Sequence, residues 1–108
     1  MNRVLLMSVA LALAGTAQAA GNAENGKAKA AQVCAACHGA EGNKPTAPEN
    51  PVLAGQYPDY LAKALKDYKA GKRNNAIMKA FAATLSSQDM EDVAAWFASQ
   101  KSNLHFQR

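Results

Sequence analysis

Small and apolar residues recur at helical spacing in residues 22–37. They form a single stripe that comprises Gly26, Ala30, Val33, Cys34 and Cys37. Because the polar side chains lie off this stripe, the pattern predicts an amphipathic helix whose small residues allow another helix to approach closely. A second interpretation of Gly26, as a cap or loop glycine, stays open at this point.

Residues 58–70 carry a second helical pattern. Pro58, followed by an acidic residue, is typical of a helix start, and Gly71 stands where a C-terminal cap is expected. The apolar stripe comprises Leu61, Ala64, Leu65 and Tyr68. We interpret Tyr60 and Tyr68 as packing residues rather than as electron relays.

A third helical pattern begins at Ser86 and extends to about residue 100. Ser86 and Asp89 have the spacing of a capping box. The buried stripe of this segment comprises Met90, Val93, Ala94 and Phe97, with Trp96 beside it. No run of residues has convincing strand character, so the sequence predicts an all-α fold.

Two loops separate the predicted helices. After His38 the chain contains glycines and then Pro45, Pro48 and Pro51, which indicates an extended loop. Residues 71–77 are polar and break the helical periodicity, and Met78 follows them directly.

The first nineteen residues have the pattern of a secretory signal peptide. Arg3 provides a positive n-region, residues 4–14 are apolar, and Ala17-Gln18-Ala19 is a small-x-small cleavage site. The apolar stretch is shorter than a transmembrane helix, and no stop-transfer segment follows it. We expect cleavage after Ala19 and export of one domain, residues 20–108, with an uncleaved N-terminal anchor as the alternative.

The composition is mildly basic, with a formal net charge of +4. This charge is too small for nucleic-acid binding, and no basic run is interleaved with aromatic residues. Six cations are concentrated in one region: Lys63, Lys66, Lys69, Lys72, Arg73 and Lys79. They form either a solvated helix face or a docking surface for acidic partners.

Residues 34–38 read Cys-Ala-Ala-Cys-His, a pattern typical of c-type haem attachment. Cys34 and Cys37 lie three positions apart, on one side of a helical turn, where both thiols can add to the vinyl groups of one haem. His38 then ligates the iron. Two alternatives compete: a redox dithiol, for which a βαβ pattern is missing, and half of a zinc site, for which a second ligand pair is missing.

The same motif raises the question of the sixth iron ligand. A histidine bound to iron usually donates its second N–H to a carbonyl group, which the proline-rich loop after His38 is expected to provide. The thioether of Met78 is favoured as the opposite ligand because this residue follows a polar loop. Met90 is interpreted as core, and His105 lies near the C-terminus. The chain has no internal repeat, so we expect one haem and not a tandem pair.

In these motifs the chain resembles the class I cytochromes c, above all the small bacterial periplasmic members and one half of the tandem two-haem members. The resemblance extends over nearly all of residues 20–108. It is carried by residues 34–39, 51–56 and 71–78, and by Leu85-Ser86 leading into the helix with Trp96-Phe97. It implies a compact all-α fold in which the N- and C-terminal helices cross, while one middle helix and loops wrap around a covalent haem.

The resemblance also implies roles for individual residues. Cys34 and Cys37 would form the thioethers, His38 would be the proximal ligand and Met78 the distal ligand. Pro51 would provide the carbonyl that accepts from the axial histidine.

Residues around the haem and at the helix crossing are implied in the same way. Leu53 would contact the haem, and Arg73 is a candidate partner of a propionate. Gly26 would pack against an aromatic residue of the last helix, Trp96 or Phe97.

The function implied is that of a monomeric periplasmic electron carrier and not an enzyme. Its partners would be redox proteins that dock transiently, with a quinol-oxidising complex on one side and a terminal oxidase or reductase on the other. A ligand-binding or peroxidatic haem protein with an open distal site is one alternative. A haem-bearing docking subunit of an oxidase is the other.

Overall fold

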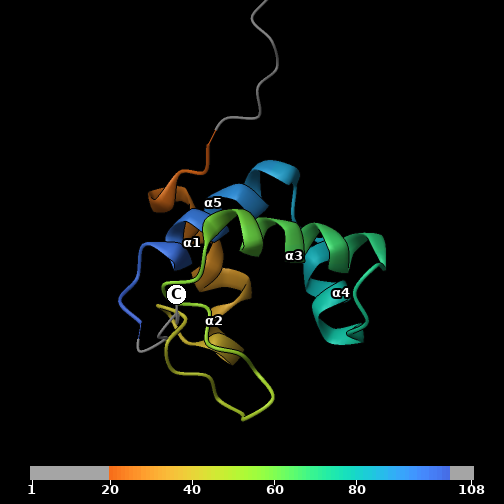
Figure 1. The fold of residues 1–108 in the computed structure, drawn as a ribbon, viewed down its shortest axis with the longest axis horizontal. Coiled ribbons are helices and arrows are strands. Elements are labelled where there is room, and N and C mark those ends of the chain that lie inside the picture. The colour runs from red at the N-terminus through yellow and green to blue at the C-terminus, as the bar shows by residue number, and fades with distance from the viewer. Residues whose placement is uncertain (1–19, 103–108) are drawn as a thin grey trace, which may run out of the picture.

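The computed structural model describes residues 20–102 and contains five α-helices in this range (Figure 1). In chain order they are α1 (Ala23–Val33), α2 (Ala35–His38), α3 (Pro58–Ala70), α4 (Ala76–Ala83) and α5 (Ser87–Ala98). The described residues contain no strand, which confirms the predicted all-α class. The predicted signal peptide, residues 1–19, and His105 lie outside the described residues.

α3 and α5 begin and end close to the predicted positions. Pro58 lies in the first turn of α3, and Gly71 ends the helix in the left-handed conformation (φ 75°), where its N–H bonds back to carbonyls of the last turn. Ser86 caps α5: its hydroxyl accepts from the N–H of Asp89, and the Asp89 carboxylate accepts from the N–H of Ser86. The local sequence signals therefore specify both helices.

The predicted first helix is interrupted at Cys34. α1 begins after Asn22, whose side chain accepts a hydrogen bond from the N–H of Asn25, and it ends at Val33. Cys34 has φ −116° and ψ −34°, away from ideal helical values, and α2 follows it. The N–H of Cys34 still donates to the carbonyl of Ala30. The cysteine motif therefore lies on a bent turn and not within one straight helix.

The structure adds a helix that the hydrophobic pattern did not predict. α4 follows the polar segment 71–75, and Met78 lies in its first turn instead of in a loop. Asn75 caps this helix, because its side-chain oxygen accepts hydrogen bonds from the N–H groups of Ile77 and Met78. The apolar segment 76–83 is too short to show a long periodic stripe. Its N-cap residue was therefore the one sequence signal for this helix.

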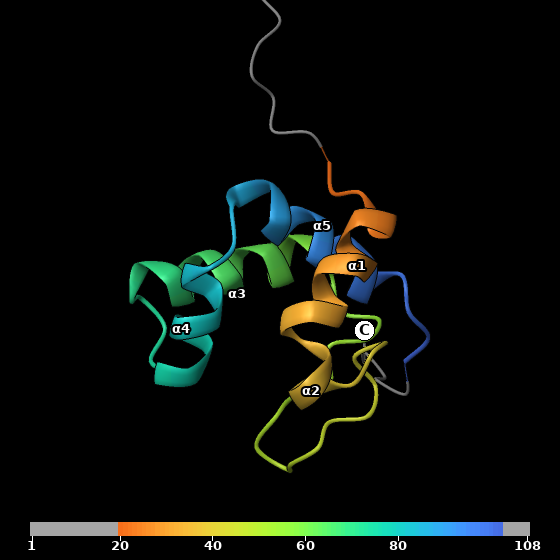
Figure 2. The ribbon, with the colours of Figure 1, turned by 180° about the vertical axis from the view of Figure 1, so that it is seen from behind.

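α1 and α5 cross in direct contact (Figure 2). A Cβ atom on Gly26 would lie 1.9 Å from the carbonyl oxygen of Asp92 and 3.0 Å from the Cβ of Trp96. The crossing has no room for a side chain at this position, and Trp96 is the aromatic residue that Gly26 contacts. The N–H of Asn22 also donates to the Asp92 carboxylate at 2.8 Å, which ties the start of α1 to α5.

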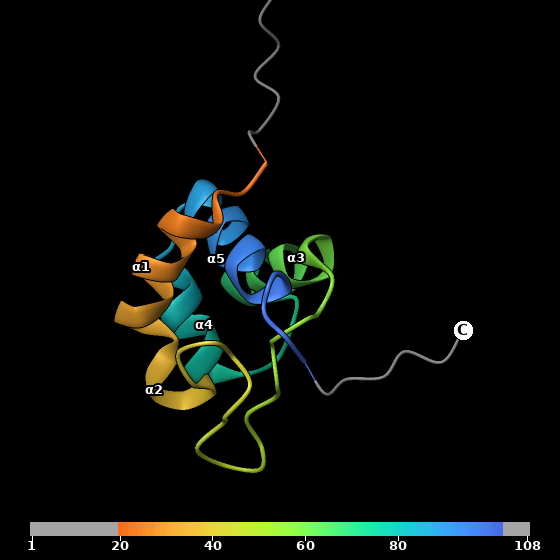
Figure 3. The same cartoon turned by 90° about the vertical axis from the view of Figure 1, so that its left-hand side faces the viewer.

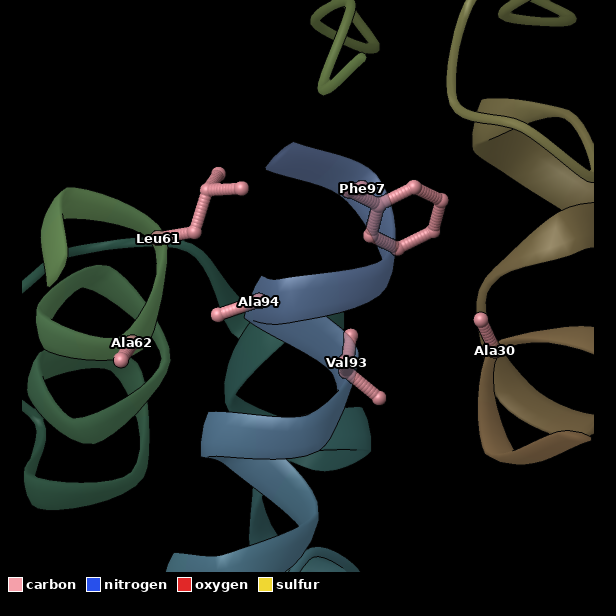
Figure 4. Packing of buried hydrophobic residues seen from close by; sticks show 6 residues of the cluster. All are labelled: Ala30, Leu61, Ala62, Val93, Ala94 and Phe97. Atoms are coloured by element: carbon pink, nitrogen blue, oxygen red, sulfur yellow. The ribbon is translucent and has the colours of Figure 1, made fainter. Parts of the chain in front are cut away.

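The main hydrophobic core lies on both sides of α5 (Figure 4). α5 lies between α3 and α1, with Ala94 directed toward α3 and with Val93 and Phe97 directed toward α1. The buried cluster consists of Ala30, Leu61, Ala62, Val93, Ala94 and Phe97. Cys34 and Leu53 pack against it, so the core continues directly into the cysteine motif.

A second buried cluster joins the end of α4 to α5. It consists of Ala82, Leu85 and Met90. Only 1% of Met90 is exposed, which confirms its prediction as a core residue. The cluster anchors the C-terminal end of α4, whereas Met78 lies near the other end of that helix.

Candidate functional site

A cavity of about 630 Å³ opens between the cysteine motif and α4. This volume lies within the range typical of small-molecule and cofactor sites. α2 and α4 lie on opposite sides of the molecule below α3 in Figures 1 and 2. We call the side formed by Cys34, Cys37 and His38 the proximal wall and the side formed by α4 with Met78 the distal wall; both line the cavity.

His38 is held in one orientation on the proximal wall. Its side chain is buried, with 5% exposed, and its Nδ1 lies 2.9 Å from the carbonyl oxygen of Pro51. When Nδ1 donates its proton to this carbonyl, Nε2 keeps a lone pair for a metal. The expected acceptor in the proline-rich loop is therefore present, and it is Pro51.

The loop of residues 39–57 braces the proximal wall. Figure 3 shows it running below α2 and returning to the start of α3. The carbonyl of Cys37 accepts hydrogen bonds from the N–H of Thr46 at 3.0 Å and from the side chain of Asn50 at 3.2 Å. Gly39 starts the loop with φ 87°, a conformation that favours glycine. The position of Cys37 is thus fixed by the loop as well as by its own helix.

The environment of Cys34 does not favour a redox dithiol. Burial, with a smaller contribution from Cys37, raises the pKa of the Cys34 thiol to about 11. Reactive thiols of oxidoreductases have lowered pKa values, so Cys34 would be a poor nucleophile in exchange. The zinc alternative also lacks support, because residues 20–102 contain no group of three or more His, Cys, Asp or Glu side chains placed to hold a metal ion.

The distal wall is more open. Met78 is half-buried and lines the cavity, and its neighbours Ile77 and Phe81 are large apolar residues with 67% and 40% of their surface exposed. Met78 presents a soft thioether that can complete octahedral iron opposite an imidazole.

The donor set and the cavity together fit haem c. Two thiols and an imidazole occur on one wall, a thioether occurs on the other, and the lining between them is mostly apolar. The family model described as cytochrome c matches residues 23–101, almost the whole described range. The chain belongs to the cytochrome c family.

Two curated relatives show how the chain compares within this family. Cytochrome c4 of Pseudomonas aeruginosa is 53% identical over 102 residues, which cover 94% of this chain and 50% of that protein. Cytochrome c-554(548) of Halomonas halodenitrificans is 41% identical over 85 residues, which cover 76% of this chain and all of that protein. The chain thus spans about half the length of the cytochrome c4 relative.

A solved structure confirms the predicted fold. Reduced recombinant cytochrome c4 from Pseudomonas stutzeri superposes with a TM-score of 0.71 at 47% identity, over 79% of this chain and 48% of that one. Together with the family match, this establishes the all-α class I cytochrome c fold. Family membership also supports covalently bound haem c as the cofactor.

The remaining predicted residues also line the cavity. Leu53 is half-buried and joins the cavity to the main core. Arg73 is exposed at the cavity edge, with its guanidinium carbon 4.9 Å from the centre of the Tyr68 ring. Tyr60 and Tyr68 both line the cavity, Tyr60 with 49% of its surface exposed, and their interpretation as packing residues stays a prediction.

The basic cluster is partly engaged in contacts within the protein. Lys63 pairs with Asp67 on the same helix, Lys66 pairs with Glu91, and Lys69 donates to a backbone carbonyl before α5. Lys66 and Lys69 are thus held by groups outside α3, which neither interpretation of the cluster included. The role of the other members in docking stays a prediction.

Two polar residues of the site were missed by the sequence argument. Asn50 supports the carbonyl of Cys37, and Asn75 caps α4 and lines the cavity. A signal for Asn75 existed, because asparagine is among the strongest N-cap residues and an apolar segment follows it. No local signal marked Asn50, whose contact joins residues thirteen positions apart.

Described residues include no helix whose length and apolar character would let it cross a membrane.

Proposed function

We propose that the chain is a soluble periplasmic electron carrier with one covalent haem c and axial ligation by His38 and Met78. The observation that carries the proposal is that the cysteine motif and Met78 line one and the same cavity. The similarity to proteins named cytochrome c4 and cytochrome c-554(548) supports it.

In this proposal the proximal residues hold the cofactor and orient it. Cys34 and Cys37 form the thioethers, and Nε2 of His38 ligates the iron while Nδ1 stays bonded to Pro51. When bound, the haem supplies a one-electron couple between ferrous and ferric iron. The mostly apolar lining, together with a thioether ligand, would favour the reduced form.

Three further residues complete the site. Met78 would provide the sulfur ligand from α4, and Leu53, which lines the cavity, would contact the haem. Arg73 is placed at the cavity edge, where its guanidinium can pair with a propionate.

The physiological setting is part of the same proposal. Residues 1–19 act as a signal peptide cleaved after Ala19, and the monomer works in the periplasm. It docks transiently with redox proteins, receiving electrons from a quinol-oxidising complex and passing them to a terminal oxidase or reductase. No substrate is transformed.

The test is a visible and near-infrared spectrum of the ferric and ferrous protein, purified from a host that matures c-type haem. We expect a low-spin spectrum with the weak near-infrared charge-transfer band of sulfur-ligated ferric haem. Met78→Leu should abolish this band, whereas the matched control Met90→Leu should retain it, because Met90 is buried in the core.

The opposite result favours the second candidate, a ligand-binding or peroxidatic haem protein. Half-burial of Met78 on an open wall is the observation that makes this candidate worth testing. A high-spin ferric spectrum that shifts on addition of cyanide, without the near-infrared band, would replace the carrier proposal. Retention of the band in Met78→Leu would reject Met78 as the ligand.

A further inference from the structure

The helix that carries Met78 is held differently at its two ends. Ala82 and the following Leu85 are buried against Met90, which fixes the C-terminal end of α4. At the other end Asn75 and Ile77 are exposed, and Met78 is only half-buried. The first turn of α4 therefore receives little support from the core.

The first turn of α4 is instead held by hydrogen bonds that Asn75 accepts. Oδ1 of Asn75 accepts from the N–H of Ile77 at 3.1 Å and from the N–H of Met78 at 3.0 Å. The backbone carbonyl of Asn75 accepts from the N–H of Lys79 at 2.9 Å. Asn75 also lines the cavity, on the same wall as Met78. The backbone of Met78 is thus bonded directly to this side chain.

We propose that Asn75 is a positioning residue for the axial thioether: its side chain caps α4 and thereby holds Met78 toward the iron. This inference rests on the proposed His/Met ligation. An isolated helix of eight residues is unstable in water, so the state of its first turn depends strongly on the cap. Loss of the cap frees the turn, and Met78 leaves the iron more often.

The chain contains two matched caps that do not touch the distal wall. Asn22 caps α1 by accepting from the N–H of Asn25, and Ser86 caps α5 by accepting from the N–H of Asp89. Removing either cap weakens a helix without changing the bonds at Met78. Asn22→Ala and Ser86→Ala are therefore the controls for Asn75→Ala.

The experiment measures how often the distal site is open. An added neutral ligand such as imidazole must displace Met78 from ferric iron, so its apparent affinity scales with the population of the open state. Loss of an N-cap shifts such a local equilibrium by about fivefold. We expect imidazole to bind the matured holoprotein of Asn75→Ala about fivefold more tightly than wild type, and the two control variants to bind it like wild type.

A thermal measurement provides the second readout. In Asn75→Ala the near-infrared band should disappear at a lower temperature than the far-ultraviolet helix signal. In the two control variants the band and the helix signal should shift together. If Asn75 had a purely structural role, the band and the helix signal would disappear at the same lowered temperature. This result would overturn the inference.

Replacements graded by capping strength complete the test. Serine is about as good an N-cap as asparagine, threonine is weaker and alanine is poor. Imidazole affinity should therefore rise from Asn75→Ser to Asn75→Thr to Asn75→Ala. If the alanine variant does not mature, the difference in imidazole affinity between the serine and threonine variants tests the inference. Equal affinities across the series would overturn the inference. A wild-type protein without the near-infrared band would instead reject the His/Met ligation itself.

Discussion

The proximal wall of the cavity is hydrogen-bonded to residues of the loop that follows it, whereas the first turn of α4 on the distal wall depends mainly on its own N-cap residue. His38 bonds to Pro51, and the carbonyl of Cys37 accepts from Thr46 and Asn50. On the distal wall, the N–H of Met78 donates a hydrogen bond to the side chain of Asn75, three positions away. Sequence-distant bonds resist local fraying, while a single short turn opens easily.

This difference suggests a division of roles within the site. In the proposed site the proximal wall, with its two cysteines and buried imidazole, would hold the cofactor in place. The distal wall would set how firmly the proposed sixth ligand, Met78, is held. Substitutions on the two walls should therefore have different signatures: loss of fold on one, and loss of ligation without loss of fold on the other.

The largest contrast should come from removing each proposed axial ligand. His38→Ala leaves a hole at a buried position and breaks the link to Pro51, so we expect a loss of about 4 kcal/mol or more of stability, or failure to mature. Met78→Ala removes a half-buried side chain and should cost about 1–2 kcal/mol. Denaturant unfolding followed by far-ultraviolet circular dichroism measures both. Equal losses would contradict the division between the walls.

The next largest effect is expected at the crossing that supports the proximal wall. Gly26→Ala gains about 1 kcal/mol of helix propensity, but its Cβ would meet the backbone of Asp92 at 1.9 Å. Backbone atoms cannot move aside cheaply, so we expect a net loss of about 2 kcal/mol or more. The near-infrared band should persist until global unfolding. Ala28→Gln, at an exposed position of the same helix, is the control and should be nearly neutral.

A smaller effect is expected from the hydrogen bonds between the loop of residues 39–57 and the cysteine motif. Asn50→Ala removes one of the hydrogen bonds to the carbonyl of Cys37 and leaves the bond from Thr46, so we expect a loss of about 1 kcal/mol. The control is Asn43→Ala, whose side chain makes a long, exposed bond to Glu41. If imidazole affinity changed in Asn50→Ala, the proximal brace would also control the distal ligand.

The smallest effect is a pH dependence at the cap of α5. The N–H of Ser86, which bonds to the carboxylate, holds the pKa of Asp89 below its ordinary value, and Lys29 contributes less. A depressed pKa in the folded state stabilises the protein above the ordinary carboxyl pKa of about 4, and this contribution is lost as the pH falls below it. Asp89→Asn should therefore lower stability at pH 7 and have little effect near pH 2.

Thermal unfolding of wild type and Asp89→Asn over this pH range measures the effect. The matched variant is Asp59→Asn, an exposed carboxylate in the first turn of α3. A constant difference between Asp89→Asn and wild type at all pH values would contradict the assignment.

The amino-acid sequence by itself determined the features whose causes are local. The spacing of Cys34, Cys37 and His38 predicts haem attachment, because thiols three positions apart share one side of a turn. Pro58 with Gly71 sets the ends of α3, and the capping box at Ser86 sets the start of α5, since these signals act within a few residues.

Only the tertiary structure decided the features that depend on contacts between distant residues. The hydrophobic pattern did not predict the bend at Cys34 or the helix α4. Both are short and depend on residues outside their own segments. Tertiary packing decides that Gly26 contacts Trp96. It also decides that the side chain of Asn50 bonds to the carbonyl of Cys37. Side-chain periodicity reports which face of a helix is buried, but not which residue lies against it.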